Sequence, residues 1–270
     1  MRDRLFACAV AGALACGASA SPWATEVISY SPGATAAPDF DNPQTALGVP
    51  TRFTGENVFG GQFASVVSPF SPPFGTDEIV SIGEGGHLTV RFDSPIRNDP
   101  SNPFGVDLIV FSNAGFVGTG TVGDPPAMFG VGSAQIEVSR DGVDFFSLGD
   151  IDTSLFPTMG YRDGGPFDSR RGTVRTEFQT PVDPSLTLDD FAGLNLGQIR
   201  GLYGASGGGI PVDVAAAMLD EIYFVRLSVA DDGDPTTELR VNIDGFAVVP
   251  APSTVGMLGL AAVGMLRRRR

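Results

Sequence analysis

The chain has 270 residues, enough for one or two domains, and its 36 Gly and 21 Pro are typical of short strands joined by turns. All 17 basic residues are arginine, and residues 21–266 hold only 11 of them against 30 acidic residues. Such an acidic body repels nucleic acid and anionic lipid, so nucleic-acid binding is excluded as a function.

The first 20 residues have the layout of a secretory signal peptide. Arg2 and Arg4 precede an apolar run over residues 5–15, and the small residues of Ala18-Ser-Ala20 fit cleavage after position 20. Both cysteines lie inside this segment, so the cleaved chain has no disulfide, no thiolate metal site and no cysteine nucleophile. Lipidation of Cys16 is the alternative.

The body between the two ends is predicted to consist of strands and long loops, with one or two short helical turns near 188–193 and 212–219. Residues 79–82 and 87–92 flank a Gly-rich turn, so they are expected to pair as a hairpin. Irregular excursions are expected over 31–62 and 150–186. The further predicted strands are 26–30, 63–67, 106–111, 222–229 and 239–249.

The clearest hairpin covers residues 134–148. Ile136 and Val138 alternate with polar residues, as in a strand with one buried face. Asp141-Gly142 supplies the turn, because both residues tolerate the positive φ that tight hairpins need. The pattern predicts an all-β fold, an antiparallel β-sandwich of jelly-roll type, as a single domain over residues 21–249.

Five short pieces of this body stand out: Ser81-Ile-Gly-Glu-Gly-Gly86, Asp107-Leu-Ile-Val-Phe111, Ile136-Glu-Val-Ser-Arg-Asp-Gly142, Gly207-Gly-Gly-Ile-Pro-Val-Asp213 and Ile243-Asp-Gly-Phe246. They look like those of exported bacterial cell-surface proteins, whose sandwich is similar to discoidin-like, galactose-binding-like jelly rolls. The resemblance implies architecture and location more than activity.

One acidic turn carries the residue types of a metal site. Asp231, Asp232 and Asp234 stand within four residues, and Asn242 and Asp244 on the following strand are expected to approach the same end of the sandwich. Hard oxygen ligands on a loop suit Ca²⁺, although the spacing is not that of an EF-hand. The alternative is a solvated acidic turn. Further candidate polar groups beside turns are Asp107, Asn113 and Asp213.

Sugar-binding and catalytic residues are sparse. Tyr161 and Tyr203 are predicted to lie in loops, where aromatic rings can cover the apolar face of a sugar, and Asp213 joins them as a ligand-binding candidate. His87 is the single histidine, and no Gly-x-Ser-x-Gly elbow accompanies it, which disfavours a serine hydrolase. A glycan hydrolase would need two carboxylates, for which the candidate glutamates are Glu84, Glu137, Glu177 and Glu221.

The C-terminus has three parts: Val249-Pro-Ala-Pro-Ser-Thr254, an apolar stretch over residues 255–266, and four arginines. As a helix the apolar stretch is roughly 18 Å long, against a hydrocarbon core of about 30 Å, so we expect only transient membrane contact. The arginines are expected to stay on the cytoplasmic side. An ordinary C-terminal anchor is the alternative.

This order of parts resembles the PEP-CTERM sorting signal of bacteria that export surface and matrix proteins, with Ala251 in place of the family's Glu. The resemblance implies a sorting segment over residues 250–270, a membrane-anchored intermediate and an exosortase-type enzyme as partner. The sorting residues that it implies are Pro250, Pro252, Ser253, Thr254, Arg267, Arg268, Arg269 and Arg270.

These observations predict an exported, non-enzymatic β-sandwich at the cell surface or in the extracellular matrix, with a structural or adhesive binding role and structural Ca²⁺. Extracellular polysaccharide and other surface proteins are the expected partners. A secreted glycan-active hydrolase is the alternative, and a self-assembling surface-layer component is the third hypothesis.

Overall fold

The computed structural model describes residues 21–251 except 59–60, 119–126, 154 and 234–237. The predicted signal peptide and the apolar tail therefore lie outside the described residues. Of the predicted sorting residues only Pro250 is described, and it is exposed. Among the residues described, no helix combines the length and the apolar character needed to cross a membrane.

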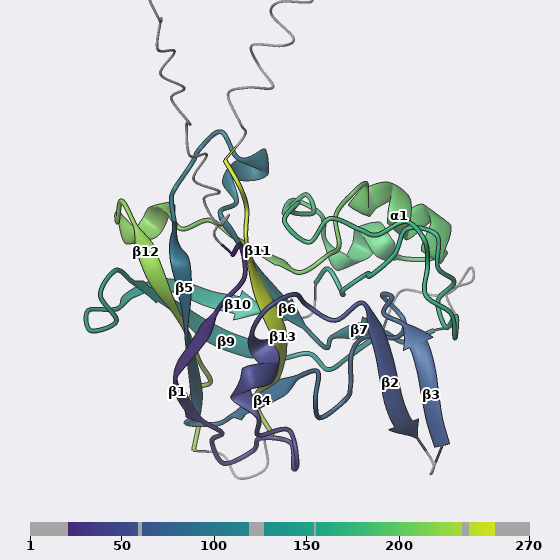
Figure 1. Cartoon of the computed structure of the whole chain (residues 1–270), viewed down its shortest axis with the longest axis horizontal. Coiled ribbons are helices and arrows are strands. Elements are labelled where there is room, and N and C mark those ends of the chain that lie inside the picture. The colour runs from purple at the N-terminus through teal and green to yellow at the C-terminus, as the bar shows by residue number, and fades with distance from the viewer. Residues whose placement is uncertain (1–20, 59–60, 119–126, 154, 234–237, 252–270) are drawn as a thin grey trace, which may run out of the picture.

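Two antiparallel sheets form a β-sandwich, which confirms the predicted all-β class (Figure 1). One sheet has the strand order β1-β5-β12-β9-β10 and the other β11-β6-β13-β4, with the ribbons β2–β3 and β7–β8 beside them. The strands are β1 (Glu26–Ser31), β2 (Phe53–Val58), β3 (Gly61–Val66), β4 (Val80–Gly83), β5 (His87–Ile96), β6 (Leu108–Ser112), β7 (Gly115–Phe116), β8 (Met128–Phe129), β9 (Ser133–Ser139), β10 (Phe146–Asp152), β11 (Ile210–Val212), β12 (Ile222–Ser228) and β13 (Arg240–Val248).

The predicted central hairpin is confirmed as β9 and β10. Ile136 and Val138 point into the core, as their alternation predicts. The turn is held by Asp141, whose carboxylate accepts hydrogen bonds from the backbone N–H groups of Val143 and Asp144 at 2.9 and 3.0 Å. Gly142 takes a φ of 78°, a conformation that glycine adopts without strain.

The main core lies between the two sheets, and the four-stranded sheet is covered on its other face as well. Val110 and Ile243 face the inter-sheet core, whereas Phe111 points outward and packs on Phe178 with ring centroids 4.9 Å apart. Burial on both faces explains why β6 is a nearly continuous apolar run.

Residues 79–96 do not form the predicted hairpin. The strands β4 and β5 belong to different sheets, so the Gly83–Gly86 turn crosses from one layer of the sandwich to the other. Gly83 packs closely, since a Cβ there would lie 2.1 Å from the backbone nitrogen of Ala36. A local turn pattern indicates a reversal of the chain, but it does not say which sheet each strand joins.

The helix α1 lies on one side of the sandwich (Figure 1), and its Leu196, Ile199 and Tyr203 share an apolar cluster with Phe191 of η3, whereas Ala46 of η1 and Ala217 of η4 belong to the main core. The predicted turn at 188–193 is confirmed as η3, with the Asp190 carboxylate accepting from the backbone N–H of Thr187 at 2.7 Å. The helix α1 was not predicted. The helices are η1 (Pro43–Ala46), η2 (Pro103–Gly105), η3 (Leu188–Phe191), α1 (Leu196–Tyr203) and η4 (Ala215–Ala217).

A second apolar cluster contains residues of η3, of α1 and of the irregular segment after β10. Phe191 is its centre, with ring centroids 5.5 Å from Phe116, 6.2 Å from Phe156 and 6.1 Å from Tyr203. The irregular excursion predicted over 150–186 starts later, because β10 extends to Asp152, and the excursion predicted over 31–62 contains η1 and β2. The described part of 153–186 contains no helix or strand, yet Phe156, Met159 and other side chains of it are buried. This segment is therefore a packed layer of the protein.

Candidate metal and ligand sites

One end of the sandwich brings together the β4–β5 turn and the connection that follows β12. The backbone N–H of Gly85 donates to the carbonyl of Val229 at 3.0 Å, and the N–H of Val229 donates to the carbonyl of Gly86 at 3.1 Å. Gly85 takes a φ of 69°, which the left-handed turn requires. This pairing places residue 84 beside residues 231 and 232.

Three carboxylates converge at this end. Oxygen atoms of Glu84, Asp231 and Asp232 lie within 4.8 Å of one another. Glu84 is only 8% exposed and its Oε1 accepts from the backbone N–H of Leu239 at 3.0 Å, whereas the two aspartates are exposed. A cluster of hard, anionic oxygens that is half open to solvent suits Ca²⁺, which completes its shell with carbonyl groups and water.

The cluster agrees with the sequence in part. Asp231 and Asp232 were predicted as metal ligands, while Asp234 lies outside the described residues. The structure does not bring Asn242 and Asp244 into the cluster, because β13 runs away from the loop and pairs residue 242 with Ser81. Sequence reasoning missed Glu84 as a ligand, although its flanking glycines indicated a turn.

Asp244 occupies a different environment, next to the segment that precedes β2. It is 2% exposed, and its carboxylate accepts from the backbone N–H of Thr51 at 2.9 Å and from the Thr51 hydroxyl at 2.8 Å. Burial raises the pKa of Asp244 to about 7 although the Thr51 hydrogen bonds lower it, and the charge of Glu78 adds to the rise. The side chain therefore ties residue 51 to β13.

Two other polar candidates, Asp107 and Asn113, make hydrogen bonds that stabilise loops. Asp107 is fully buried and accepts from the backbone N–H of Asp99 and the side-chain amide of Asn102, both at 2.9 Å. Burial raises the pKa of Asp107. Asn113 accepts from the Asn242 amide at 3.2 Å. These bonds fasten the loops at either end of β6.

Asp213, predicted to bind a ligand, is exposed just before η4. Its Oδ1 accepts from the backbone N–H of Ala215 at 2.8 Å. The contact closes the turn that leads into this helix. The structure does not place Asp213 beside either predicted tyrosine, because those two rings belong to the packed segment of residues 156–205, which we call the 156–205 layer.

The prediction that Tyr161 and Tyr203 are exposed aromatic platforms is wrong. Tyr161 is 5% exposed and Tyr203 is 3% exposed. The Tyr203 hydroxyl donates to the carbonyl of Pro157 at 3.0 Å, and its ring packs edge-on against Phe191. Tyr203 is the last residue of α1 and belongs to the second apolar cluster, while Tyr161 is buried beside its β-bridge to Arg175.

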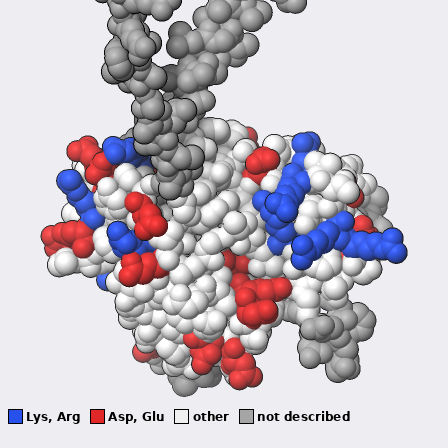
Figure 2. Space-filling view, in the orientation of Figure 1, with Lys and Arg blue, Asp and Glu red and all other residues white. Residues whose placement is uncertain are grey.

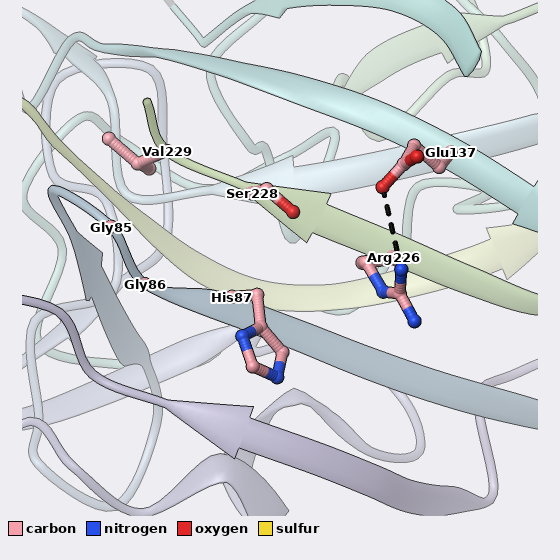
Figure 3. Close-up of a pocket in the computed structure, with 7 residues that line it drawn as sticks. All are labelled: Gly85, Gly86, His87, Glu137, Arg226, Ser228 and Val229. Atoms are coloured by element: carbon pink, nitrogen blue, oxygen red, sulfur yellow. Dashed lines mark ion pairs between the residues drawn. The ribbon is translucent and has the colours of Figure 1, made fainter. Parts of the chain in front are cut away.

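An open pocket of about 370 Å³ lies on the five-stranded sheet beside the carboxylate cluster (Figure 3). Arg226 points across it toward Glu137, with 3.7 Å between Nη1 and Oε2, and its guanidinium also lies 3.6 Å from the ring centre of Phe145. The His87 ring turns away from Ser228, although the two residues are cross-strand partners. Burial and the charge of Arg226 lower the pKa of His87.

The four glutamates considered for glycan hydrolysis have different partners. Glu84 belongs to the carboxylate cluster, Glu137 pairs with Arg226, and Glu221 pairs with Arg97. Glu177 is exposed at the start of the segment that covers the four-stranded sheet. Each of these carboxylates thus has its own surroundings in the described part of the chain.

A scan against models of known protein families finds no match to this chain, and a search of curated proteins finds no similar sequence.

Proposed function

We propose that the protein is an exported, non-enzymatic β-sandwich of the cell surface or extracellular matrix, which holds Ca²⁺ and serves a structural or adhesive binding role. The observation that carries the proposal is the convergence of Glu84 with Asp231 and Asp232, which come from segments almost 150 positions apart. The signal-peptide pattern and the resemblance of residues 249–270 to a sorting tail support the exported location, with an exosortase-type enzyme acting at the tail.

Calcium has a clear physical task at this place. Three carboxylates within 4.8 Å repel one another, and the aspartates stand on a connection that interrupts the sandwich between β12 and β13. A divalent cation cancels this repulsion and links the connection to the β4–β5 turn. The bound ion thereby stabilises the connection between β12 and β13. Two pockets lie beside this connection, and both are lined by Ser228 and Val229.

Calcium titration of the purified chain by calorimetry tests the proposal. One ion is expected to bind per chain, with a Kd of about 10⁻⁴ to 10⁻³ M, the range of extracellular calcium modules. Glu84→Gln and Asp232→Asn are each expected to weaken binding roughly tenfold or more, because each removes a charged ligand.

Asp144→Asn is the matched control, since it removes the same charge from the exposed turn between β9 and β10. This turn lies at the opposite end of β9 from Gln135, the residue that pairs with Ser228. Equal weakening in the control and in the two site variants would show a general charge effect and would contradict the assigned ligands.

A further inference from the structure

The arginines of this acidic protein are unevenly distributed. Five belong to the sandwich sheets and their turns, and four of these five form ion pairs with glutamate or aspartate. The other six of the 11 arginines in the described part of the chain come from the 160–176 loop, from the residue just before β2 and from α1. Figure 2 shows arginines gathered on the right-hand side, away from most acidic side chains. We call these six the arginine surface: Arg52, Arg162, Arg170, Arg171, Arg175 and Arg200.

Backbone contacts bring these residues together. Tyr161 and Arg175 form a β-bridge, and the N–H of Arg162 donates to the carbonyl of Val174 at 2.8 Å, which closes the loop that carries Arg170 and Arg171. The Arg171 guanidinium lies 5.2 Å from the ring centre of Phe53, and Phe53 directly follows Arg52 in the chain.

Arginines of this surface are close enough for their charges to interact. Burial lowers the pKa of Arg52, and the positive charge of Arg175 lowers it further. Arg52 is fixed by hydrogen bonds to the carbonyl of Gly160 and the hydroxyl of Thr176, at 2.8 and 3.0 Å, and by the Phe178 ring beneath it. Arg52 is therefore a fixed positive charge beneath the more exposed arginines.

Two of the acids near these arginines, Asp163 and Asp168, are hydrogen-bonded to the loop backbone, and their charges act on Arg200 as that of Glu177 acts on Arg52. Asp163 accepts from the backbone N–H groups of Thr173 and Val174 at 2.8 and 3.0 Å, and the hydroxyl and N–H of Thr173 help to lower the pKa of Asp163 to about 2. Asp168 accepts from the N–H of Gly165. Within the described ranges, none of the six arginines has a carboxylate at ion-pair distance, unlike the sandwich arginines.

We propose that the arginine surface binds an acidic polysaccharide, a chain of sugars that carry carboxylate or sulfate groups. Planar guanidinium groups match such anions with two parallel hydrogen bonds. Phe167 and Val174 stand among these arginines at 51% and 48% exposure, and they offer apolar contacts for the faces of sugar rings.

Charge density favours this partner over nucleic acid. Duplex DNA carries a charge for about every 1.7 Å of its axis, so phosphates beyond the arginine surface would meet the acidic remainder of the protein. A uronate chain has at most one charge per sugar and can place its carboxylates on the arginines alone. The choice of a polysaccharide also rests on the exported location proposed above, whereas the arginine surface itself does not.

Binding of the purified full chain to polygalacturonate, with uncharged dextran as the reference polymer, tests the proposal. The measurement is made in chelator, so that the calcium site does not contribute and its failure would not affect the result. Polygalacturonate is expected to bind, dextran is not, and the affinity is expected to fall as salt is raised. The double variant R170Q/R171Q is expected to lose roughly tenfold or more in affinity, because two charge-assisted hydrogen-bonding groups are removed.

The control is R97Q/R140Q, which removes the same charge from two exposed positions of the sandwich and is expected to keep the affinity. Unchanged melting temperatures show that both variants fold. The proposal is overturned by the absence of polygalacturonate binding or by an equal loss in the control. It is also overturned if single-stranded DNA or phosphatidylglycerol vesicles bind more tightly than polygalacturonate, or if the arginine surface instead drives self-association at low salt.

Discussion

Phe191→Ala is expected to lower the free energy of unfolding by about 3–5 kcal/mol, the range for removing a large buried aromatic side chain. Phe191 is 1% exposed and contacts the rings of Phe116, Phe156 and Tyr203. The loss combines the apolar transfer term with the cavity left among three rigid rings. The second apolar cluster joins β7 to the 156–205 layer, so this cost should appear in the unfolding of the whole chain.

Denaturant unfolding followed by far-UV circular dichroism and by intrinsic fluorescence measures this effect. Phe92→Ala, in the main core, is expected to give a similar loss, and Phe167→Ala, at a residue 51% exposed, is expected to change stability by less than about 0.5 kcal/mol. Two separate transitions, with only the minor one shifted by Phe191→Ala, would mean that the 156–205 layer folds independently of the sandwich.

Stability is expected to fall by about 4 kcal/mol between pH 4 and pH 8 because of Asp244 alone. The pKa of this carboxyl is about 7 in the folded chain and 3.8 in the unfolded reference. Between these values the folded state keeps a proton that the unfolded state has released. The stabilisation is complete below about pH 4 and is lost as the pH rises through 7.

Asp244→Asn removes this pH dependence, because the amide has no proton to release and its oxygen still accepts from Thr51. The variant is therefore expected to be several kcal/mol more stable than the wild type at pH 8. Denaturant unfolding at pH 4, 6 and 8 measures the difference, and comparison with the wild type cancels the opposite contribution of His87, whose lowered pKa favours the folded state as pH rises.

Asp144→Asn serves as the exposed control and is expected to keep the pH dependence of the wild type. Parallel curves for Asp244→Asn and the wild type would show that Asp244 is ionised in the folded chain throughout this range.

Much of the fold could be predicted because its strands carry their own periodicity. Ile136 and Val138 alternate, and β6 is apolar on both faces, so each pattern matches the burial observed. The helix α1 was missed although Asn195 and Gln198 cap it reciprocally at 3.0 Å. It has only eight residues, and a single apolar stripe of that length is a weak signal beside the surrounding glycines.

The candidate sites were less predictable, because their members are distant in the sequence. The acidic turn drew attention to Asp231 and Asp232, but the partner Glu84 is placed by the sheet crossing at Gly83–Gly86, which no local pattern reveals. The arginine surface joins Arg52 and Arg200, which lies on α1, to the 160–176 loop, and no local pattern in the sequence links these three segments. Tyr161 and Tyr203 were wrongly predicted to be exposed for the same reason, because their burial depends on contacts between segments that are distant in the sequence.

Thermal unfolding of the chain in excess Ca²⁺ and in chelator tests the calcium-stabilised sandwich most directly. Calcium at about 100 times its Kd is expected to add roughly 2.7 kcal/mol and to raise the Tm by roughly 5–11 °C, a shift that Asp232→Asn reduces by about half or more and Asp144→Asn retains. Identical melting curves in calcium and in chelator would contradict the calcium site and leave Glu84, Asp231 and Asp232 as solvated surface.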